Sequence, residues 1–135
     1  MPKSGMTSKM KCVFLVSCGR RKKSHAVPAK ELYVSARFQR ARISVEATGC
    51  LWFVISAEHG LLGPDEIIDP YDKTLKGAPP KARKEWAEKV KGQMDKHLPD
   101  GEIIVILAEE DYYKDLIPYL KERFAHVMIP EEECH

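Results

Sequence analysis

The sequence contains few cysteines and no long hydrophobic run. Its 135 residues include four cysteines, and none of them forms a Cys-x-x-Cys pair, so no disulfide framework or zinc motif is indicated. We expect reduced thiols and a cytoplasmic location. No apolar stretch approaches the roughly 20 residues that cross a bilayer, so we expect no membrane partner. The N-terminus lacks the apolar core of a secretory signal.

The chain also lacks a large net charge. The formal net charge is +2, which argues against a protein that binds nucleic acid with its whole surface. The charge is uneven, however, because no Asp or Glu precedes Glu31, whereas residues 131–133 are all Glu. Such local charge concentrates anionic ligands whatever the total. Neither a GxGxxG run nor the Walker spacing is present, which excludes a dinucleotide fingerprint and a P-loop.

Strands and helices are expected to alternate along the chain. We expect a flexible leader over residues 1–10, one α/β domain over 11–130 and an acidic tail over 131–135. Short apolar, β-branched runs predict strands, and apolar residues at helical spacing predict helices. The expected strands cover residues 11–17, 51–57, 102–108 and 126–129, and the expected helices cover 29–48, 79–97 and 109–124, the last kinked or split at Pro118. This order predicts a three-layer domain with a mostly parallel sheet of about four strands and helices on both faces.

Polar loops follow three of the expected strands. The loops that leave the carboxyl ends of parallel strands share one edge of the sheet, and ligands bind there. The segments concerned are residues 17–24, 57–74 and 108–113. The second is a long connection without a helix, which is uncommon in a compact domain unless it is functional. We therefore expect the first two loops to emerge side by side and to form the walls of one cavity.

The first of these loops is basic. Gly19 lets backbone N–H groups approach a ligand, and the four cations at residues 20–23 supply charge and donors. This pattern favours a phosphate or carboxylate site, with a solvated basic loop as the alternative. Cys18 is a candidate nucleophile because nearby cations favour its thiolate, although it also suits a small residue that fills the strand end.

His59 is the best candidate for acid–base chemistry. It follows a buried strand at the ligand edge, Gly60 gives the backbone freedom, and an imidazole titrates near neutral pH. Glu58 is placed to orient it. The alternative is a histidine that only hydrogen-bonds the loop into shape.

The segment from Pro70 to Thr74 has the composition of a turn. Within it, Tyr71 is suited to stack on a base and Asp72 to act as a base. The acidic residues at 65, 66 and 69 match no metal-loop spacing, and we expect neither a metal nor a cofactor. At the start of the first expected helix, Glu31 is placed to hold the basic loop through an arginine, or to contact substrate.

The expected site residues fall into two groups. The catalytic candidates are His59, Glu58, Cys18 and Asp72. The candidates for phosphate or substrate binding are Ser17, Gly19, Arg20, Arg21, Lys22, Glu31, Tyr33, Ser56, Gly60, Tyr71 and Thr74.

Several of these motifs occur together in known families. The run SCGRRK at residues 17–22, KELY at 30–33, SAEHGLLGPD at 56–65 and PYDKTL at 70–75 resemble a small uncharacterised bacterial, archaeal and phage domain family. The same half of the chain is distantly similar to the YaaA peroxide-stress proteins, in which a Tyr is usual where this chain has His59. The second resemblance implies biology related to DNA or nucleotides.

These observations predict a small enzyme that acts on a nucleotide or a nucleic-acid base. The basic loop is expected to hold phosphate, and His59 to move a proton during hydrolysis or transfer at a glycosidic or phosphoester bond. The alternative is a non-catalytic module that binds a nucleotide or nucleic acid in a DNA modification, stress or defence system. The sequence does not indicate an oligomeric state.

Overall fold

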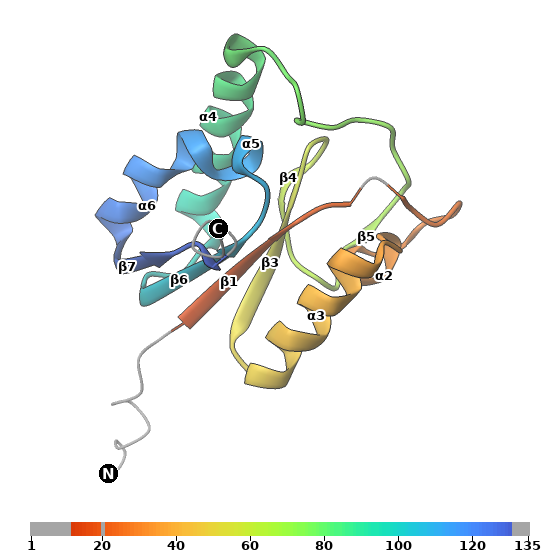
Figure 1. The fold of residues 1–135 in the computed structure, drawn as a ribbon, viewed down its shortest axis with the longest axis horizontal. Coiled ribbons are helices and arrows are strands. Elements are labelled where there is room, and N and C mark those ends of the chain that lie inside the picture. Colours follow the sequence, from red (N-terminus) through yellow and green to blue (C-terminus); the bar gives the residue numbers. More distant parts are fainter. Residues whose placement is uncertain (1–11, 20, 131–135) are drawn as a thin grey trace.

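A computed structural model describes residues 12–19 and 21–130 (Figure 1). The predicted leader and acidic tail therefore lie outside the described residues, as does Arg20. In chain order the elements are β1 (Cys12–Ser17), β2 (Val27–Pro28), α2 (Ala29–Leu32), α3 (Ala36–Thr48), β3 (Leu51–Ser56), β4 (Gly60–Leu62), β5 (Ile67–Ile68), α4 (Pro80–His97), β6 (Gly101–Leu107), α5 (Glu110–Tyr113), the 3-10 helix η1 (Lys114–Leu116), α6 (Ile117–Arg123) and β7 (Phe124–Met128).

The strands form a five-stranded, mostly parallel sheet with the order β4-β3-β1-β6-β7. The central strand β1 pairs in parallel with β3 and β6, and β6 pairs in parallel with β7. Only the edge strand β4 is antiparallel to its neighbour β3. The prediction of a mostly parallel sheet in a single α/β domain is confirmed, and the structure adds this fifth strand.

Helices cover both faces of the sheet, with α3 on one side and α4 and α6 on the other (Figure 1). The central strands are apolar on both faces because both are covered, and Leu15, Val54 and Ile104 are fully buried. Helix α4 buries Trp86, Val90 and Met94, which the four-residue spacing of these side chains predicts.

The prediction of a single helix over residues 29–48 is wrong in one respect, because the structure has two helices there, α2 and α3. The chain leaves the helical path between α2 and α3, where Leu32 and Val34 exchange backbone hydrogen bonds with the basic loop: Lys23 N donates to Leu32 O and Val34 N donates to Arg21 O, each at 2.9 Å. Ser35 then caps α3 by accepting a hydrogen bond from Phe38 N at 3.3 Å. Pairing with the basic loop therefore replaces one turn of helix.

The connection from Ala57 to Thr74 is not an unstructured loop. Its first residues form a tight hairpin that returns as β4, and β5 pairs with β2 in a small antiparallel sheet. Gly60 permits the hairpin, because its φ is +75° and a Cβ there would overlap the Gln93 carboxamide. Backbone pairing therefore fixes the course of this segment at β4 and β5.

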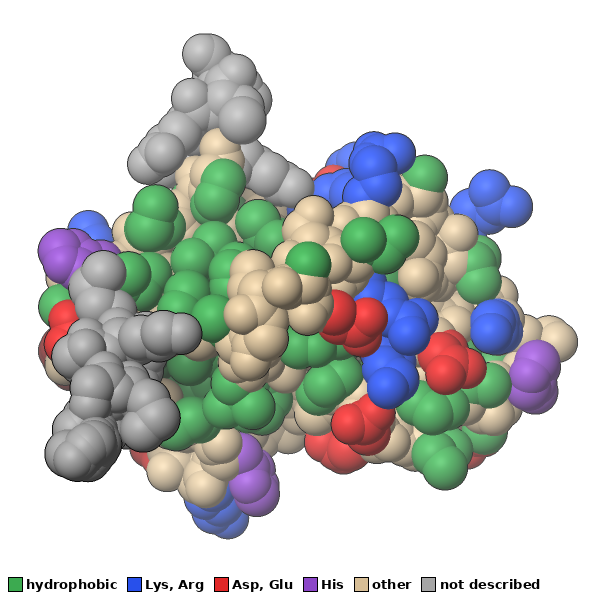
Figure 2. Space-filling model, turned by 90° about the horizontal axis from the view of Figure 1, so that it is seen from below, with side chains coloured by type: hydrophobic (Ala, Val, Ile, Leu, Met, Phe, Trp, Pro, Cys, Tyr) green, Lys and Arg blue, Asp and Glu red, His purple; other side chains and the backbone are tan. Residues whose placement is uncertain are grey.

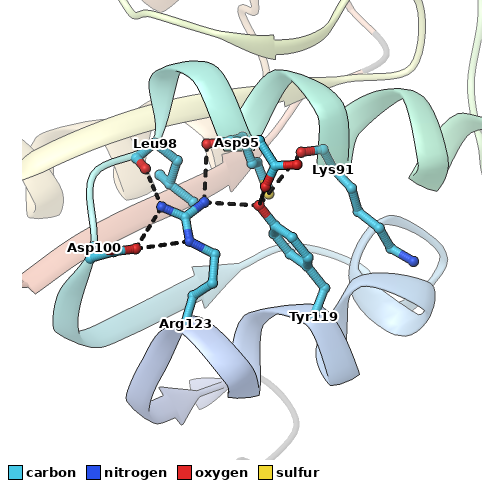
Figure 3. A network of polar contacts seen from close by, with 7 residues as sticks. Lys91, Asp95, Leu98, Asp100, Tyr119 and Arg123 are labelled. Carbon is cyan, nitrogen blue, oxygen red and sulfur yellow. Dashed lines mark hydrogen bonds and ion pairs between the residues drawn. The ribbon is translucent and has the colours of Figure 1, made fainter.

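The last helical segment is divided, as Pro118 predicts. Helix α5 passes into η1, and α6 begins one residue before Pro118. Arg123, at the end of α6, ties this segment to α4: it pairs with Asp100 at 2.8 Å and donates to the carbonyls of Met94 and Leu98 (Figure 3). A cation is favourable there because the last carbonyls of a helix lack partners within it.

Among the helices in residues 12–19 and 21–130, none has both the length and the apolar composition needed to cross a membrane.

Candidate functional site

The carboxyl ends of β1 and β3 lie side by side at one edge of the sheet. Ser17 is in register with Ile55, and the next residue, Cys18, donates its backbone N–H to Ile55 O at 3.0 Å. The basic loop and the loop that carries His59 therefore leave the sheet next to each other. The two loops emerge side by side as expected, but the described lining of the crevice at this edge includes no residue of 57–74, so the expectation that both loops form its walls is wrong.

A cluster of buried hydroxyl groups lies between these two loops, centred on Tyr71. Ser56 Oγ donates to the Tyr71 hydroxyl at 2.8 Å, and the Tyr71 and Tyr33 hydroxyls are 2.7 Å apart. Ser56 Oγ also accepts the backbone N–H groups of Glu58 and His59, at 3.2 and 3.0 Å. Serine and tyrosine hydroxyls thus connect the end of β3 to the turn that precedes α3.

Burial keeps these tyrosines protonated. It raises the pKa of Tyr33 and of Tyr71, and the nearby Cys18 raises both further. Burial is the main cause that raises the pKa of Tyr112 to about 12, and the charge of Cys18 is the second cause. At neutral pH the three side chains are therefore neutral hydroxyls that can donate as well as accept.

Cys18 joins a second set of polar contacts. Its thiol is buried and donates to the Tyr112 hydroxyl at 3.4 Å. The same hydroxyl accepts the backbone N–H of Leu75 at 3.3 Å and lies 3.5 Å from Thr74 Oγ1. Tyr112, at the start of α5, therefore fixes residues 74–75 beside the end of β1.

Lys22 is the described cation of the basic loop that lies against the hydroxyl cluster. Its Nζ is 4.4 Å from the centre of the Tyr71 ring and 5.9 Å from that of Tyr33. Lys23 lies elsewhere, in a hollow with Glu31 and Arg42. Glu31 was predicted to hold the basic loop through Arg20 or Arg21; Arg20 lies outside the described residues, and Arg21 lines a different hollow from Glu31.

His59 is held from several directions. Its ring packs edge-on against Tyr71, with the ring centres 5.3 Å apart, and its carbonyl accepts from Gln93 Nε2 at 3.0 Å. Glu58 and Asp72, the two proposed assistants, are exposed. The structure thus brings His59 to the hydroxyl cluster and leaves the two carboxylates at the surface.

A crevice of about 270 Å³ opens beside this cluster. It lies outside the carboxyl ends of β1 and β6, where the strand order reverses, because the chain runs from β1 to β3 on one side while β6 lies on the other. In an open α/β sheet this reversal is where ligands bind. The described residues that line the crevice are Cys18, Gly19, Arg21, Ser35, Arg37, Lys76 and Glu109.

The crevice has a positive lining. The described lining residues include three cations, Arg21, Arg37 and Lys76, and one acidic residue, Glu109. Arg37 comes from the first turn of α3, and its Nη1 donates to Ser17 Oγ at 3.4 Å. The positive end of the α3 dipole adds to these charges. The arrangement suits an anion.

Gly19 shapes the floor of the crevice. A Cβ at this position would lie 2.9 Å from Ser35 Oγ, the atom that caps α3. Glycine therefore lets the basic loop run directly against the beginning of the helix.

Within the described ranges, no group of three or more His, Cys, Asp or Glu side chains is placed to hold a metal ion.

One protein-family model matches most of the chain. The family of unknown function DUF6884 matches residues 13–135. The chain belongs to this family. No curated protein and no solved structure matches the chain.

Four crevice residues of this DUF6884 member were not among the predicted site residues. Ser35 and Arg37 were placed inside one long helix, so the cap and the exposed first turn of α3 were missed. Lys76 follows the predicted loop and carries no motif. Glu109 was assigned to a helix start, although its position just after a strand at the ligand edge was a usable signal.

Proposed function

We propose that the crevice binds the phosphate of a nucleotide or of a nucleic-acid constituent, and that the protein is an enzyme acting on this ligand. The observation that carries the proposal is the position of Arg21, Arg37 and Lys76 around a crevice at the reversal of strand order. Arginine forks match phosphate oxygens in geometry. Backbone N–H groups at a helix start complete such a site.

The hydroxyl cluster offers a neighbouring surface for the sugar or base. The Tyr71 hydroxyl is bonded to Ser56 and Tyr33, so contact with the ligand falls to its ring and to Lys22 and His59 beside it. The resemblance to the YaaA peroxide-stress proteins, which implies DNA- or nucleotide-related biology, supports this class of ligand.

The reaction that we propose is hydrolysis or transfer at a glycosidic or phosphoester bond. For a ligand held in the crevice we assign proton transfer to Glu109, because its carboxylate lines that space. His59 is the second candidate, since it lies behind Tyr71 and is not among the described lining residues. A positioned acid or base of this kind typically contributes 10²–10⁴-fold to a rate.

Binding is tested by titrating the purified chain with nucleoside monophosphates and with inorganic phosphate in a calorimeter. We expect Arg37→Ala and Lys76→Ala to weaken binding about tenfold or more, since a charged hydrogen bond contributes about 1.5–3 kcal/mol. Lys81→Ala is the control, because Lys81 is an exposed cation at the start of α4. Equal affinities for all three variants would contradict the assignment of the crevice.

Turnover is tested by chromatography of the same nucleotides after incubation with the protein. Glu109→Gln should abolish product formation and retain binding, whereas His59→Asn should retain both. Loss of turnover in His59→Asn alone would return the acid–base role to His59. A chain that binds without turnover would be the non-catalytic module. The salt dependence of the affinity would then identify the ligand. For duplex nucleic acid, a plot of the logarithm of the binding constant against the logarithm of the salt concentration has a slope near −0.9 per phosphate contacted.

A further inference from the structure

Two cysteines lie next to each other at the opposite edge of the sheet from the crevice. Val13 of β1 is in parallel register with Leu51 of β3. One residue earlier, β1 begins with Cys12, and Cys50 immediately precedes β3. Neighbouring strands are about 4.8 Å apart, which lies inside the Cα separation of roughly 4.4–6.8 Å that a disulfide requires.

The two side chains also share a face. Residues directly opposite each other in a parallel pair point to the same side of the sheet. The two thiols contact each other through a side-chain hydrogen bond. Burial raises the pKa of Cys12, and the charge of Cys50 and this hydrogen bond raise that pKa further.

Both thiols are within reach of small molecules. Cys12 and Cys50 are each partly exposed, whereas Cys18 is buried at the other edge. Figure 2 views the molecule from below, the side on which β1 and β3 begin in Figure 1.

We propose that Cys12 and Cys50 form a thiol–disulfide exchange site that oxidised glutathione, or another small disulfide, converts to an intramolecular disulfide. One cysteine thiolate attacks a glutathione sulfur, the S–S bond of glutathione breaks, and one glutathione thiolate leaves. The second cysteine thiolate attacks the mixed disulfide and expels the other glutathione. Two electrons pass from the cysteine pair to glutathione disulfide, and the two thiol protons end on the two glutathione molecules.

Either thiolate can make the first attack, because the two cysteines lie side by side at the start of neighbouring strands. The resulting bond closes the loop from residue 12 to residue 50, which contains the basic loop, α2 and α3. A cross-link over a loop of this length restricts the unfolded chain and so stabilises the folded one. The oxidised form should therefore unfold at a temperature higher by about 5 °C or more.

The test uses the full chain equilibrated with glutathione disulfide and then alkylated. Before alkylation we expect a mass loss of about 2 Da relative to the reduced chain, and after alkylation a proteolytic peptide in which Cys12 is joined to Cys50. Cys12→Ser should instead accumulate one glutathione on Cys50, because no second thiol resolves the adduct. Cys134→Ser serves as the matched control and should form the cross-link normally.

Three results would overturn the proposal: both thiols remaining reduced in excess glutathione disulfide, stable double glutathionylation, or a cross-link to a different cysteine. Dithiothreitol should restore the original mass and melting temperature. Because nucleotide binding is measured separately on the reduced chain, failure of this pair would leave the proposed function of the crevice untouched.

Discussion

The hydroxyl group of Tyr71 accepts a hydrogen bond from Ser56 Oγ at 2.8 Å, although Ser56 ends β3 and Tyr71 lies 15 residues further along the chain. Ser56 is fully buried, and the same tyrosine hydroxyl is 2.7 Å from that of Tyr33. One oxygen atom thus joins three segments: the end of β3, residues 70–74 and the break between α2 and α3. Removal of the Tyr71 hydroxyl should therefore affect all three segments.

Tyr71→Phe should lower the free energy of unfolding by about 1–3 kcal/mol, because it leaves a buried Tyr33 hydroxyl without this partner. Denaturant unfolding measures the change. Tyr33→Phe and the double variant complete a mutant cycle, in which we expect the two losses to be less than additive. Strict additivity would show that the two hydroxyls are not coupled.

Stability should fall as the pH rises above about 10. The tyrosines of the unfolded chain ionise near pH 10, whereas burial and Cys18 raise the pKa of Tyr112 to about 12 in the folded protein. Between these values the unfolded state has lost protons that the folded state retains. Each such tyrosine therefore lowers the free energy of unfolding by up to about 1.4 kcal/mol per pH unit between these two pKa values.

The measurement is denaturant unfolding between pH 9 and pH 12 for the wild type and for Tyr112→Phe. The variant should show a shallower loss of stability with pH. Tyrosinate absorbance provides the direct reading, since fewer tyrosines should ionise at pH 11 in the folded than in the unfolded protein. Identical titrations in the two states would contradict the burial of these hydroxyls.

Gly19→Ala should destabilise the protein by about 1 kcal/mol. The new Cβ would lie 2.9 Å from Ser35 Oγ, so Ser35 would have to turn away and give up its cap on α3, which is worth about this amount. Gly92→Ala is the matched control. Gly92 lies in α4 with no atom within 4 Å of an added Cβ, and this substitution should stabilise the helix by about 0.5–1 kcal/mol.

Arg123→Met should cost about 2–3 kcal/mol of unfolding free energy. The guanidinium bonds the carbonyls of Met94 and Leu98 and the carboxylate of Asp100, and methionine keeps the length but none of the donors. Arg40→Met, at an exposed position of α3, should change stability by less than about 0.5 kcal/mol. Thermal melts of the two variants make the comparison, and similar melting temperatures would remove Arg123 as a tie between α6 and α4.

Elements with one strong local signal were predictable from the sequence. The runs at β1, β3 and β6 are short, apolar and β-branched, and the structure places strands there. Helix α4 begins at Pro80 and has apolar residues every four positions. Pro118 predicted the division before α6, because proline has no backbone N–H to donate to the preceding turn of a helix.

The elements that were missed depend on distant partners. Residues 33–35 have helical neighbours, yet pairing of residues 32 and 34 with the basic loop breaks the helix. Strand β4 has three residues and forms because β3 is beside it. The crevice residues Arg37 and Glu109 become neighbours only once β1 and β6 are adjacent in the sheet. The local pattern contains none of these long-range pairings.

Strand β4 is the last strand on its side of the sheet and is three residues long. The outer strand of a sheet usually exposes amide groups onto which another polypeptide can add. Here the amide of Leu61 already donates to Gln93 Oε1 at 2.8 Å, so a side chain of α4 occupies a position that a foreign strand would need. This edge is thereby less open to the addition of a strand from another molecule.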